Sequence, residues 1–507
     1  MAHDKRLIGI DKERLVVGQI RKWLKSYPIV MLSGPRKVGK TVALLQIAAN
    51  PGYRVETRFI DCSDGAAPST LSELLTENRF AGILLLDEFH LLEDAQDWLL
   101  TFHNRLNDHS SFKVVITGSV AAQITFLAQR RGGGRNRLLH LPVLTYLEYL
   151  HFTCDIPYDA DLLLVTSEAS FKDYMVLKNL RGFEMAPIDE RYVQDAGLEI
   201  ALARRASSYT TALLNSNEIT IQHALLLLAY RLIDTWGFDK TFASPPIGNK
   251  ETSAADAAHN LRQRGAFDGS RLAEAVRASL TREQIQDALR YLIWNDLAYC
   301  NFAETDIDAN LDTQLLASLL LGKDLSPEQL DSLFTNRVQI CVVSPMFYSM
   351  IADELWEKIR DCLKEHSGEH KPLFSKVARI MRDRDVISSD PHLLGNWVEA
   401  YLRGAYALRS ATPMITSSFI TESQREIDIA RGGLENVLIE VAVKQDEKKE
   451  KDVNFHLAYT GKEKCFLTTK STLEHVVWQG VPILRIPYHM LAAHLDRGEL
   501  PSDICCR

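Results

Sequence analysis

Residues 34–41 have the residue types and the spacing of a phosphate-binding loop. They read Gly-Pro-Arg-Lys-Val-Gly-Lys-Thr, the pattern G-x-x-x-x-G-K-[ST], and they stand between an apolar run at 29–32 and a helix-like run at 42–47. The pattern needs this context of strand, turn and helix start. A turn of this kind directs backbone N–H groups and a helix N-terminus at a polyphosphate. An ordinary surface turn is the alternative, and both flanking runs count against it.

Each side chain of this loop has an expected part in binding ATP and Mg²⁺. Gly34 and Gly39 are expected to let the backbone come close to the phosphates. Lys40 would reach the β- and γ-phosphates, and the hydroxyl of Thr41 would ligate Mg²⁺. The sequence therefore predicts ATP as the bound nucleotide, with Mg²⁺ as its cofactor.

An acidic pair follows about fifty residues later. The apolar run 81–86 is typical of a buried parallel strand, and it ends in Asp87 and Glu88. In ATPases with such a loop, an acid at this strand end holds Mg²⁺, and a second acid beside it polarises the attacking water. We expect Asp87 to hold the metal and Glu88 to act as the base. A simple loop cap is the other interpretation of the pair.

Two further groups could reach the same site. The run 113–119 ends in the hydroxyls of Thr117 and Ser119, which would either sense the γ-phosphate or cap the following helix. The segment 130–137 then places four arginines around three glycines. It is either a solvated basic loop or a loop that presents Arg135 to ATP, in cis or from a neighbouring subunit.

Composition restricts the class of protein. A chain of 507 residues is long enough for about three domains, and its hydrophobic content of 46% lets each bury a core. A net charge of −8 argues against a protein that coats polyanions along its whole surface. The eight cysteines form no Cys-x-x-Cys pair, so we expect free thiols and no structural zinc. No apolar run approaches 18 residues, so we expect a cytoplasmic protein without membrane contact.

The first domain, residues 1–160, is predicted to be an α/β parallel sheet with helices on both faces. Apolar strands at 28–32, 57–61, 82–87 and 113–117 alternate with helical patterns.

Residues 161–345 are predicted to form a helical and winged-helix domain. A capping box at 281–284 opens a helix, and strand-like runs at 297–302 and 338–343 are predicted to pair as a wing. Some winged helices read DNA with their third helix. Polar residues of this helix would either contact DNA or form an exposed face of an ATPase lid: Arg282, Gln284, Gln286 and Arg290.

Residues 346–507 are predicted to form a mixed α/β domain. An amphipathic helix at 393–402 carries Glu399, and two hairpin-like strands carry Asp428 and Glu440. Further strands are expected at 464–468 and 481–486, and a final helix near 488–496.

The whole chain resembles a prokaryotic family of AAA-like P-loop ATPases with C-terminal restriction-endonuclease-like domains of unknown function. The motifs that carry the resemblance are GPRKVGKT, LLLDEFH, VVITGS and GGGRNRLLHLPVLTYLEYL. On this alignment Arg135 matches the family arginine and Glu148 its late glutamate, whereas Val143 stands where the family usually has proline. In the middle of the chain, residues 181–183 stand in for a Gly-Gly-x-Pro pattern, and Ser344-Pro345 replaces an expected acid.

The resemblance implies that the C-terminal domain has the PD-(D/E)xK nuclease fold. Glu399 would be its helix acid, Asp428 its metal-binding acid and Glu440 its strand acid. In active nucleases of this type a lysine two residues after the strand acid positions the attacking water, and Ala442 stands at that place here. Lys444 lies on the same strand face, about 6.6 Å further along at roughly 3.3 Å per residue.

These inferences predict an ATPase that acts on or with nucleic acid, DNA rather than RNA, in a setting such as defence against foreign DNA. The first alternative is an ATP-switched regulatory protein whose inactive nuclease-like domain is a scaffold for a protein partner; Ala442 favours it. The second is a motor or loader that assembles as a homo-oligomer on DNA, with Arg135 acting in trans.

Overall fold

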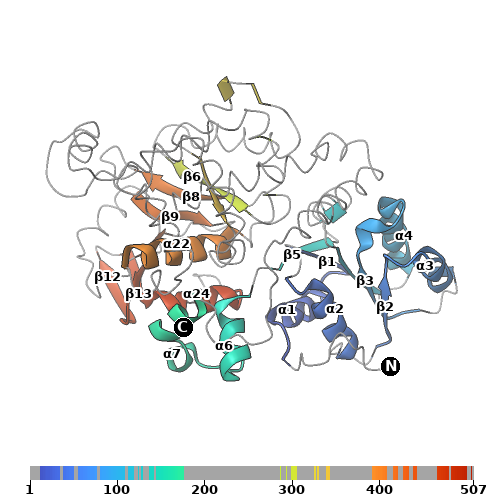
Figure 1. The fold of residues 1–507 in the computed structure, drawn as a ribbon, viewed down its shortest axis with the longest axis horizontal. Coiled ribbons are helices and arrows are strands. Elements are labelled where there is room, and N and C mark those ends of the chain that lie inside the picture. The colour runs from blue at the N-terminus through green and yellow to red at the C-terminus, as the bar shows by residue number, and fades with distance from the viewer. Residues whose placement is uncertain are drawn as a thin grey trace, which may run out of the picture. The chain divides into compact units, whose positions relative to one another are not determined.

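The computed structural model describes only part of the chain. The described residues are 12–34, 38–50, 55–76, 80–108, 112–118, 136–141, 144–175, 298–304, 338–342, 391–407, 415–420, 426–432, 438–441, 465–478 and 481–499, with 124, 127–128, 286, 293, 325–326, 328–329 and 504. They divide into two compact units (Figure 1). The first contains the described residues up to Tyr158 together with Ile293, and the second contains the rest.

The first unit is built on a parallel sheet. Its strands are β1 (Ile29–Ser33), β2 (Thr57–Asp61), β3 (Ile83–Asp87), β4 (Lys113–Thr117) and β5 (Asn136–His140), in the order β2-β3-β4-β1-β5. Every neighbouring pair is parallel. The four predicted strands are therefore confirmed, and β5 is a fifth that the sequence did not reveal. This order puts β4 between the strand of the phosphate loop and the strand of the acidic pair.

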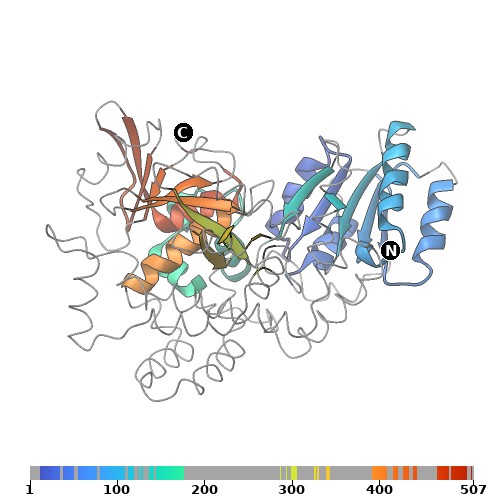
Figure 2. The same cartoon turned by 90° about the horizontal axis from the view of Figure 1, so that it is seen from above.

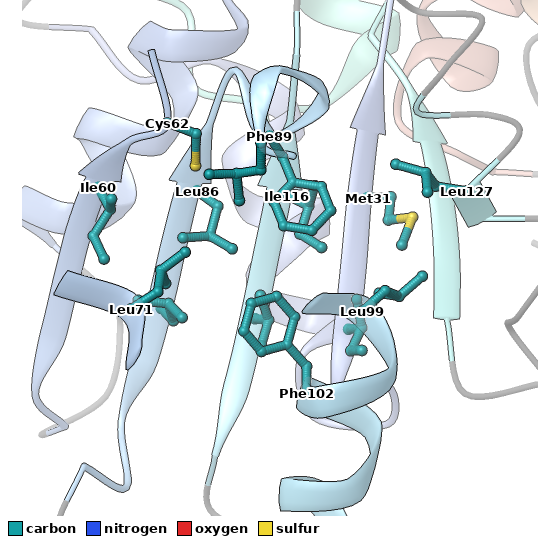
Figure 3. Packing of buried hydrophobic residues seen from close by; sticks show 14 of the residues in the cluster. Met31, Ile60, Cys62, Leu71, Leu86, Phe89, Leu99, Phe102, Ile116 and Leu127 are labelled. Atoms are coloured by element: carbon teal, nitrogen blue, oxygen red, sulfur yellow. The ribbon is translucent and has the colours of Figure 1, made fainter. Parts of the chain in front are cut away.

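Helices cover both faces of this sheet (Figures 1 and 2). They are α1 (Leu15–Trp23), α2 (Lys40–Ala49), α3 (Ala67–Thr76), η2 (Phe89–Leu91) and α4 (Ala95–Asp108), and a further helix of this unit, α6 (Tyr146–Cys154), follows β5 in the chain. On one face, Leu71 of α3 and Phe102 of α4 pack in a single buried cluster with Leu86 and Ile116 of the sheet (Figure 3). Alternate strand residues, such as Leu85, point to the other face, where α2 packs. The predicted α/β architecture of this unit is confirmed.

The second unit is built on a mixed sheet of eight strands. They are β6 (Ala298–Glu304), β7 (Val338–Val342), β8 (Ile415–Ile420), β9 (Glu426–Gly432), β10 (Leu438–Glu440), β11 (Cys465–Thr469), β12 (Glu474–Trp478) and β13 (Val481–Pro487). Their order is β12-β13-β11-β10-β9-β8-β6-β7. The predicted strands near 425–429, 437–444, 464–468 and 481–486 overlap β9, β10, β11 and β13, whereas β8 and β12 were not predicted.

Four helices are described in the second unit, and aromatic side chains of the last three pack together. They are α7 (Leu162–Val165), α8 (Glu168–Met175), α22 (Pro391–Ala407) and α24 (Tyr488–Asp496). Phe171 of α8 meets Tyr401 of α22 and Tyr488 of α24 edge to face. The Tyr401 hydroxyl donates to Asp496 at 2.8 Å. The division into domains 1–160, 161–345 and 346–507 stays a prediction, because most of 161–345 lies outside the described residues.

The two strands predicted to form a separate wing are part of the eight-stranded sheet in the structure. Strands β6 and β7 pair antiparallel, as predicted, but β6 also pairs with β8 in parallel, so both belong to the large sheet. Gln286 is buried, and its side chain accepts a hydrogen bond from the Leu325 N–H at 3.2 Å. The prediction of Gln286 on an exposed face is therefore wrong. The other three polar residues of that helix lie outside the described residues, as does the capping box.

Candidate nucleotide-binding site

The phosphate loop begins and ends at glycines that no other residue could replace without strain. Gly34, directly after β1, has φ +152°, and a Cβ there would lie 2.5 Å from the carbonyl oxygen of Leu141. Gly39 caps the start of α2 with φ +92° and ψ 27°, in the left-handed region. Helix α2 then begins at Lys40. The predicted strand before the loop and the helix start after it are confirmed, whereas residues 35–37 of the loop lie outside the described residues.

Lys40 reaches back across this loop. Its side chain is buried, and its Nζ donates to the carbonyl oxygen of Gly34 at 2.8 Å. The ammonium group thus lies against the loop backbone at the N-terminus of α2, which is where a lysine must lie to meet a polyphosphate.

Thr41 and Asp87 are brought together from different elements. The Thr41 side chain at the start of α2 lies close enough to the carboxyl group of Asp87, at the end of β3, to lower its pKa. Hydroxyl and carboxylate oxygens suit Mg²⁺, which keeps several waters and takes only one or two protein ligands beside phosphate oxygens. Among the described residues, no three His, Cys, Asp or Glu side chains are grouped to hold a metal by themselves. The pair therefore fits a metal that arrives with a nucleotide.

Burial disfavours the ionised form of Asp87. Desolvation raises the pKa of Asp87 above its ordinary value, and the negative charges of Glu88 and Asp61 add to this effect. Hydrogen bonds from Thr41 and from the Glu88 N–H oppose it. A bound cation would relieve the same repulsion, since an opposite charge close by favours the ionised form.

Glu88 is held in an unusual backbone conformation. It has φ +51° and ψ 35°, and its Oε2 lies 3.4 Å from Nδ1 of His90. His90 is buried against the backbone of Gly118, where a Cβ would lie 2.5 Å from the same Nδ1. His90 therefore lies between the expected base and the end of β4. The sequence reasoning missed this role, although a histidine two places after the acid was visible in the motif.

The buried thiol of Cys62 lies beside the acidic residues at this end of the sheet. Burial, and then the charges of Asp61, Asp87 and Glu88, raise the pKa of Cys62 to about 12. Its backbone N–H donates to the carbonyl oxygen of Asp87 at 2.9 Å. Cys62 is thus a neutral packing group beside the acids at neutral pH.

Of the remaining residues predicted for the ATP site, Thr117 is described by the structure, whereas two others are not. Thr117 is fully buried, and its hydroxyl donates to the carbonyl oxygen of Leu32 in β1 at 3.0 Å. It therefore ties β4 to the strand that leads into the phosphate loop. Ser119 and Arg135 lie outside the described residues. Arg137, from the same arginine segment, stacks over the ring of Trp23 with 4.3 Å to the centroid.

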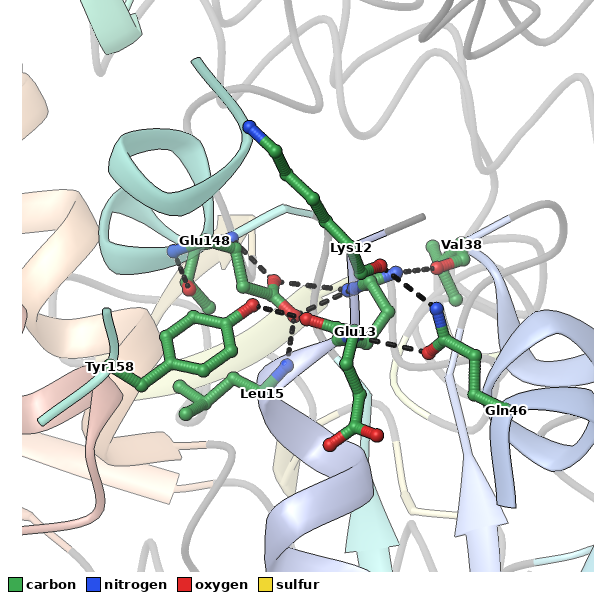
Figure 4. Close-up of polar contacts among 9 residues, drawn as sticks. Lys12, Glu13, Leu15, Val38, Gln46, Glu148 and Tyr158 are labelled. Atoms are coloured by element: carbon green, nitrogen blue, oxygen red, sulfur yellow. Dashed lines mark hydrogen bonds and ion pairs between the residues drawn. The ribbon is translucent and has the colours of Figure 1, made fainter. Parts of the chain in front are cut away.

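A second polar network reaches the phosphate loop at Val38 (Figure 4). Arg14 and Glu148 form an ion pair with 3% and 1% of their side chains exposed. The sequence offered no reason to select Arg14, and it singled out Glu148 only through the family resemblance.

The nuclease-like residues lie in the second unit, where two of them occupy facing positions. The antiparallel register pairs Ile429 with Ile439, which places Asp428 opposite Glu440 one step along. Only the backbone is described at these two positions. Glu399 is buried on α22 and pairs with Arg403 at 2.6 Å. Lys444 lies outside the described residues.

A comparison with protein families identifies the first unit. Residues 26–150 match the model of a family described as an AAA domain. They form an AAA-family P-loop ATPase domain. The match spans the phosphate loop, the acidic pair, β4 and Glu148, so every described group of the expected ATP site lies within this AAA domain.

Comparison with solved structures gives remote likenesses. A DNA replication initiation factor is 16% identical, with 52% of this chain and 91% of that chain covered and a TM-score of 0.21. AMPPCP-bound DnaA from Aquifex aeolicus is 17% identical, with the same coverage and a TM-score of 0.22. A STAND-type signal transduction ATPase with a tetratricopeptide repeat sensor, from Pyrococcus horikoshii, is 12% identical, with 78% and 67% covered and a TM-score of 0.20. TM-scores this low carry no argument about function. No similar curated protein was found.

A search for membrane-spanning helices gave none. Within the described ranges, every helix is too short or too polar to cross a bilayer.

Proposed function

We propose that the AAA domain binds ATP with Mg²⁺ and hydrolyses it, and that the protein acts on or with nucleic acid. One observation carries the first part: the phosphate-loop helix starts at Lys40, and its next residue, Thr41, lies close enough to Asp87 at the acidic strand end to lower the pKa of that carboxyl. Two elements about fifty residues apart in sequence thus meet at the place where a nucleotide and its metal need them.

The chain's own residues account for the steps of hydrolysis. Lys40 and the N-terminus of α2 would bind the phosphates, and Thr41 with Asp87 would hold Mg²⁺. The metal would supply charge neutralisation on the phosphate oxygens. Glu88 would accept the proton of the attacking water, since it directly follows β3 beside Asp87, the expected metal ligand.

The test is ATP turnover by the full chain with and without Mg²⁺. Replacing the base, Glu88→Gln, should lower the rate about 10²- to 10⁴-fold with ATP still bound. Lys40→Ala should lose binding as well as turnover. Equal turnover in wild type and both variants would show that the activity does not come from this site.

For the second unit we propose a nuclease-like domain that engages DNA. The facing positions of Asp428 and Glu440 on β9 and β10 support it, because two carboxylates on adjoining strands are a means of holding Mg²⁺. The pairing of Glu399 with Arg403 and the alanine at 442 favour the alternative, an inactive scaffold that binds a partner under ATP control.

A cleavage assay separates the two. Linear DNA, plasmid DNA and RNA would be incubated with Mg²⁺ or Mn²⁺, with and without ATP, using wild type, Asp428→Ala and Lys40→Ala. Cutting that is lost in Asp428→Ala establishes a working nuclease, and its dependence on Lys40 shows whether ATP gates it. No cutting of any substrate, with ATP turnover intact, favours the scaffold.

A further inference from the structure

The ion pair between Arg14 and Glu148 includes a direct contact with the phosphate loop. Arg14 Nε lies 2.6 Å from Glu148 Oε1, and Nη2 lies 3.1 Å from Oε2, so the two planar groups are joined by two parallel bonds. The third nitrogen, Nη1, donates to the carbonyl oxygen of Val38. Figure 4 shows this carbonyl at one end of the network and Glu148 at the other.

The guanidinium group of Arg14 also leaves no room for a side chain at position 39 of the loop. A Cβ added to Gly39 would lie 2.8 Å from Arg14 Nη1. Arg14 thus fills the space beside Gly39 and holds the carbonyl of the residue before it. Because the N–H groups that follow are those that face a phosphate, a fixed turn at 38–39 presents them already oriented.

Glu148 is itself fixed in place. Besides the two bonds from Arg14, its carboxylate accepts from the backbone N–H of Leu15 at 3.1 Å and from that of Thr145 at 3.0 Å. The Thr145 hydroxyl in turn accepts from the Glu148 N–H, which completes a capping box at the start of α6. A carboxylate with four donors has little freedom to release the arginine.

The backbone around Arg14 is anchored on two sides. Gln46 of α2 accepts from the Arg14 N–H at 3.1 Å and donates to the carbonyl oxygen of Lys12 at 2.9 Å. The Lys12 ammonium donates to the carbonyl oxygens of His151 and Phe152 near the end of α6. The segment 12–15 therefore connects the helix of the phosphate loop to α6.

We propose that Arg14 is a positioning residue for the nucleotide site, which fixes the turn at Val38 and Gly39, and that Glu148 orients Arg14 for this purpose. The inference rests on the proposed binding of ATP. A purely structural ion pair, one that only holds α1 and α6 together, is the role to be distinguished.

Arg14→Lys is the informative substitution. A lysine keeps the positive charge beside Glu148, so the carboxylate stays paired, but a single ammonium cannot serve both Glu148 and Val38 in this geometry. The dissociation constant of ATP with Mg²⁺ should rise at least about tenfold, equivalent to about 1.4 kcal/mol. Glu148→Gln should weaken ATP binding in the same direction, because an amide cannot accept both bonds from Arg14.

A second ion pair, between Glu13 of this segment and Arg21 of α1, provides the matched control. Arg21 and Glu13 also form two bonds, both of 2.7 Å, but their contacts lie away from residues 38 and 39. Arg21→Lys and Glu13→Gln should leave the ATP dissociation constant within about twofold of wild type. Thermal unfolding without nucleotide is measured for all four variants, to show that each is folded.

Exchanging the partners separates positioning from stability. The double variant Arg14→Glu with Glu148→Arg restores an ion pair, yet it removes the donor to Val38. It should unfold at a higher temperature than Arg14→Glu alone and still bind ATP weakly. Unchanged ATP affinity in Arg14→Lys would overturn this inference alone. No ATP binding by the wild-type chain would overturn the proposed function and this inference with it.

Discussion

Asp87 shows how the expected ATP site opposes the stability of the fold. Asp87 as a whole residue is 4% exposed, and it stands beside the charges of Glu88 and Asp61. A buried charge with like charges beside it destabilises the folded chain unless a cation joins it. The hydrogen bond from Thr41 offsets only part of this cost, because the pKa of Asp87 remains raised.

Replacing this carboxylate should therefore stabilise the protein and stop its reaction. The folded-state pKa of Asp87 lies above its ordinary value of 3.8, so between those two values the folded chain holds a proton that the unfolded chain has lost. The free energy of unfolding then falls as pH rises through this window, and the loss persists at higher pH. Asp87→Asn should be more stable than wild type at pH 7, with no gain at pH 3. Urea unfolding at both pH values checks this, and lower stability of the variant at pH 7 would contradict it.

His90 gives a second prediction at the scale of one residue. Its ring lies 3.4 Å from Glu88 Oε2, and we expect it to hold the base in place. His90→Ala should lower ATP turnover about tenfold, below the about 10²-fold or greater loss expected for the base itself, with ATP affinity unchanged.

His103→Ala is the control for this variant, because it also removes a buried imidazole, from α4. It should keep full turnover per folded molecule. Equal losses of turnover in the two variants would mean that His90 acts only through packing.

The helices that flank the phosphate loop show how position decides the effect of a glycine. Gly18 lies inside α1 with open space around its Cα, whereas Gly39 has φ +92° and Arg14 beside it. Gly18→Ala should stabilise the protein by about 0.5–1 kcal/mol through the entropy of the unfolded chain. Gly39→Ala should destabilise it by at least roughly 1–2 kcal/mol and weaken ATP binding.

Chemical denaturation with ATP titration measures both glycine variants. A stable Gly39→Ala protein with unchanged ATP affinity would show that the left-handed turn is not required.

Local pattern predicts elements well where a strand is apolar. Strands β1, β3 and β4 lie in the middle of the sheet and read as apolar runs, so their sequence alone predicts them. Strand β5, with Asn-Arg-Leu-Leu-His, has no apolar run or clean alternation. It is a strand because β1 offers it a free edge, and that pairing is invisible in a local window.

The residues of the candidate site likewise include some that the local sequence predicts and some that only the fold brings together. Residues 34, 39, 40 and 41 belong to one short motif, and Asp87 and Glu88 follow a recognisable apolar run. Their place in the site can therefore be predicted from sequence spacing alone. Arg14 and Glu148 are separated by 134 positions, and only the fold brings them together behind the loop. The register that sets Asp428 opposite Glu440 likewise needed the structure, although both acids were selected beforehand.

At the scale of the whole molecule, the chain has two compact units with separate sheets. A ligand that binds only one of them stabilises that unit by mass action, by about 2.7 kcal/mol at a concentration of 100 times its dissociation constant. We expect ATP with Mg²⁺ to raise the midpoint of one calorimetric transition and to leave another in place. Lys40→Ala should abolish the shift. An equal shift of all transitions would show that the units unfold together.

The central claim, a working ATP site at residues 34–41, is tested most directly by the equilibrium binding of ATP to the full chain with Mg²⁺. Wild type, Lys40→Ala and Lys22→Ala would be titrated side by side, since Lys22 is an exposed lysine of α1 outside the site. The account predicts saturable binding of one ATP per chain in wild type and Lys22→Ala, and none at the same concentrations in Lys40→Ala. Equal binding by all three proteins, or binding by none, would contradict it.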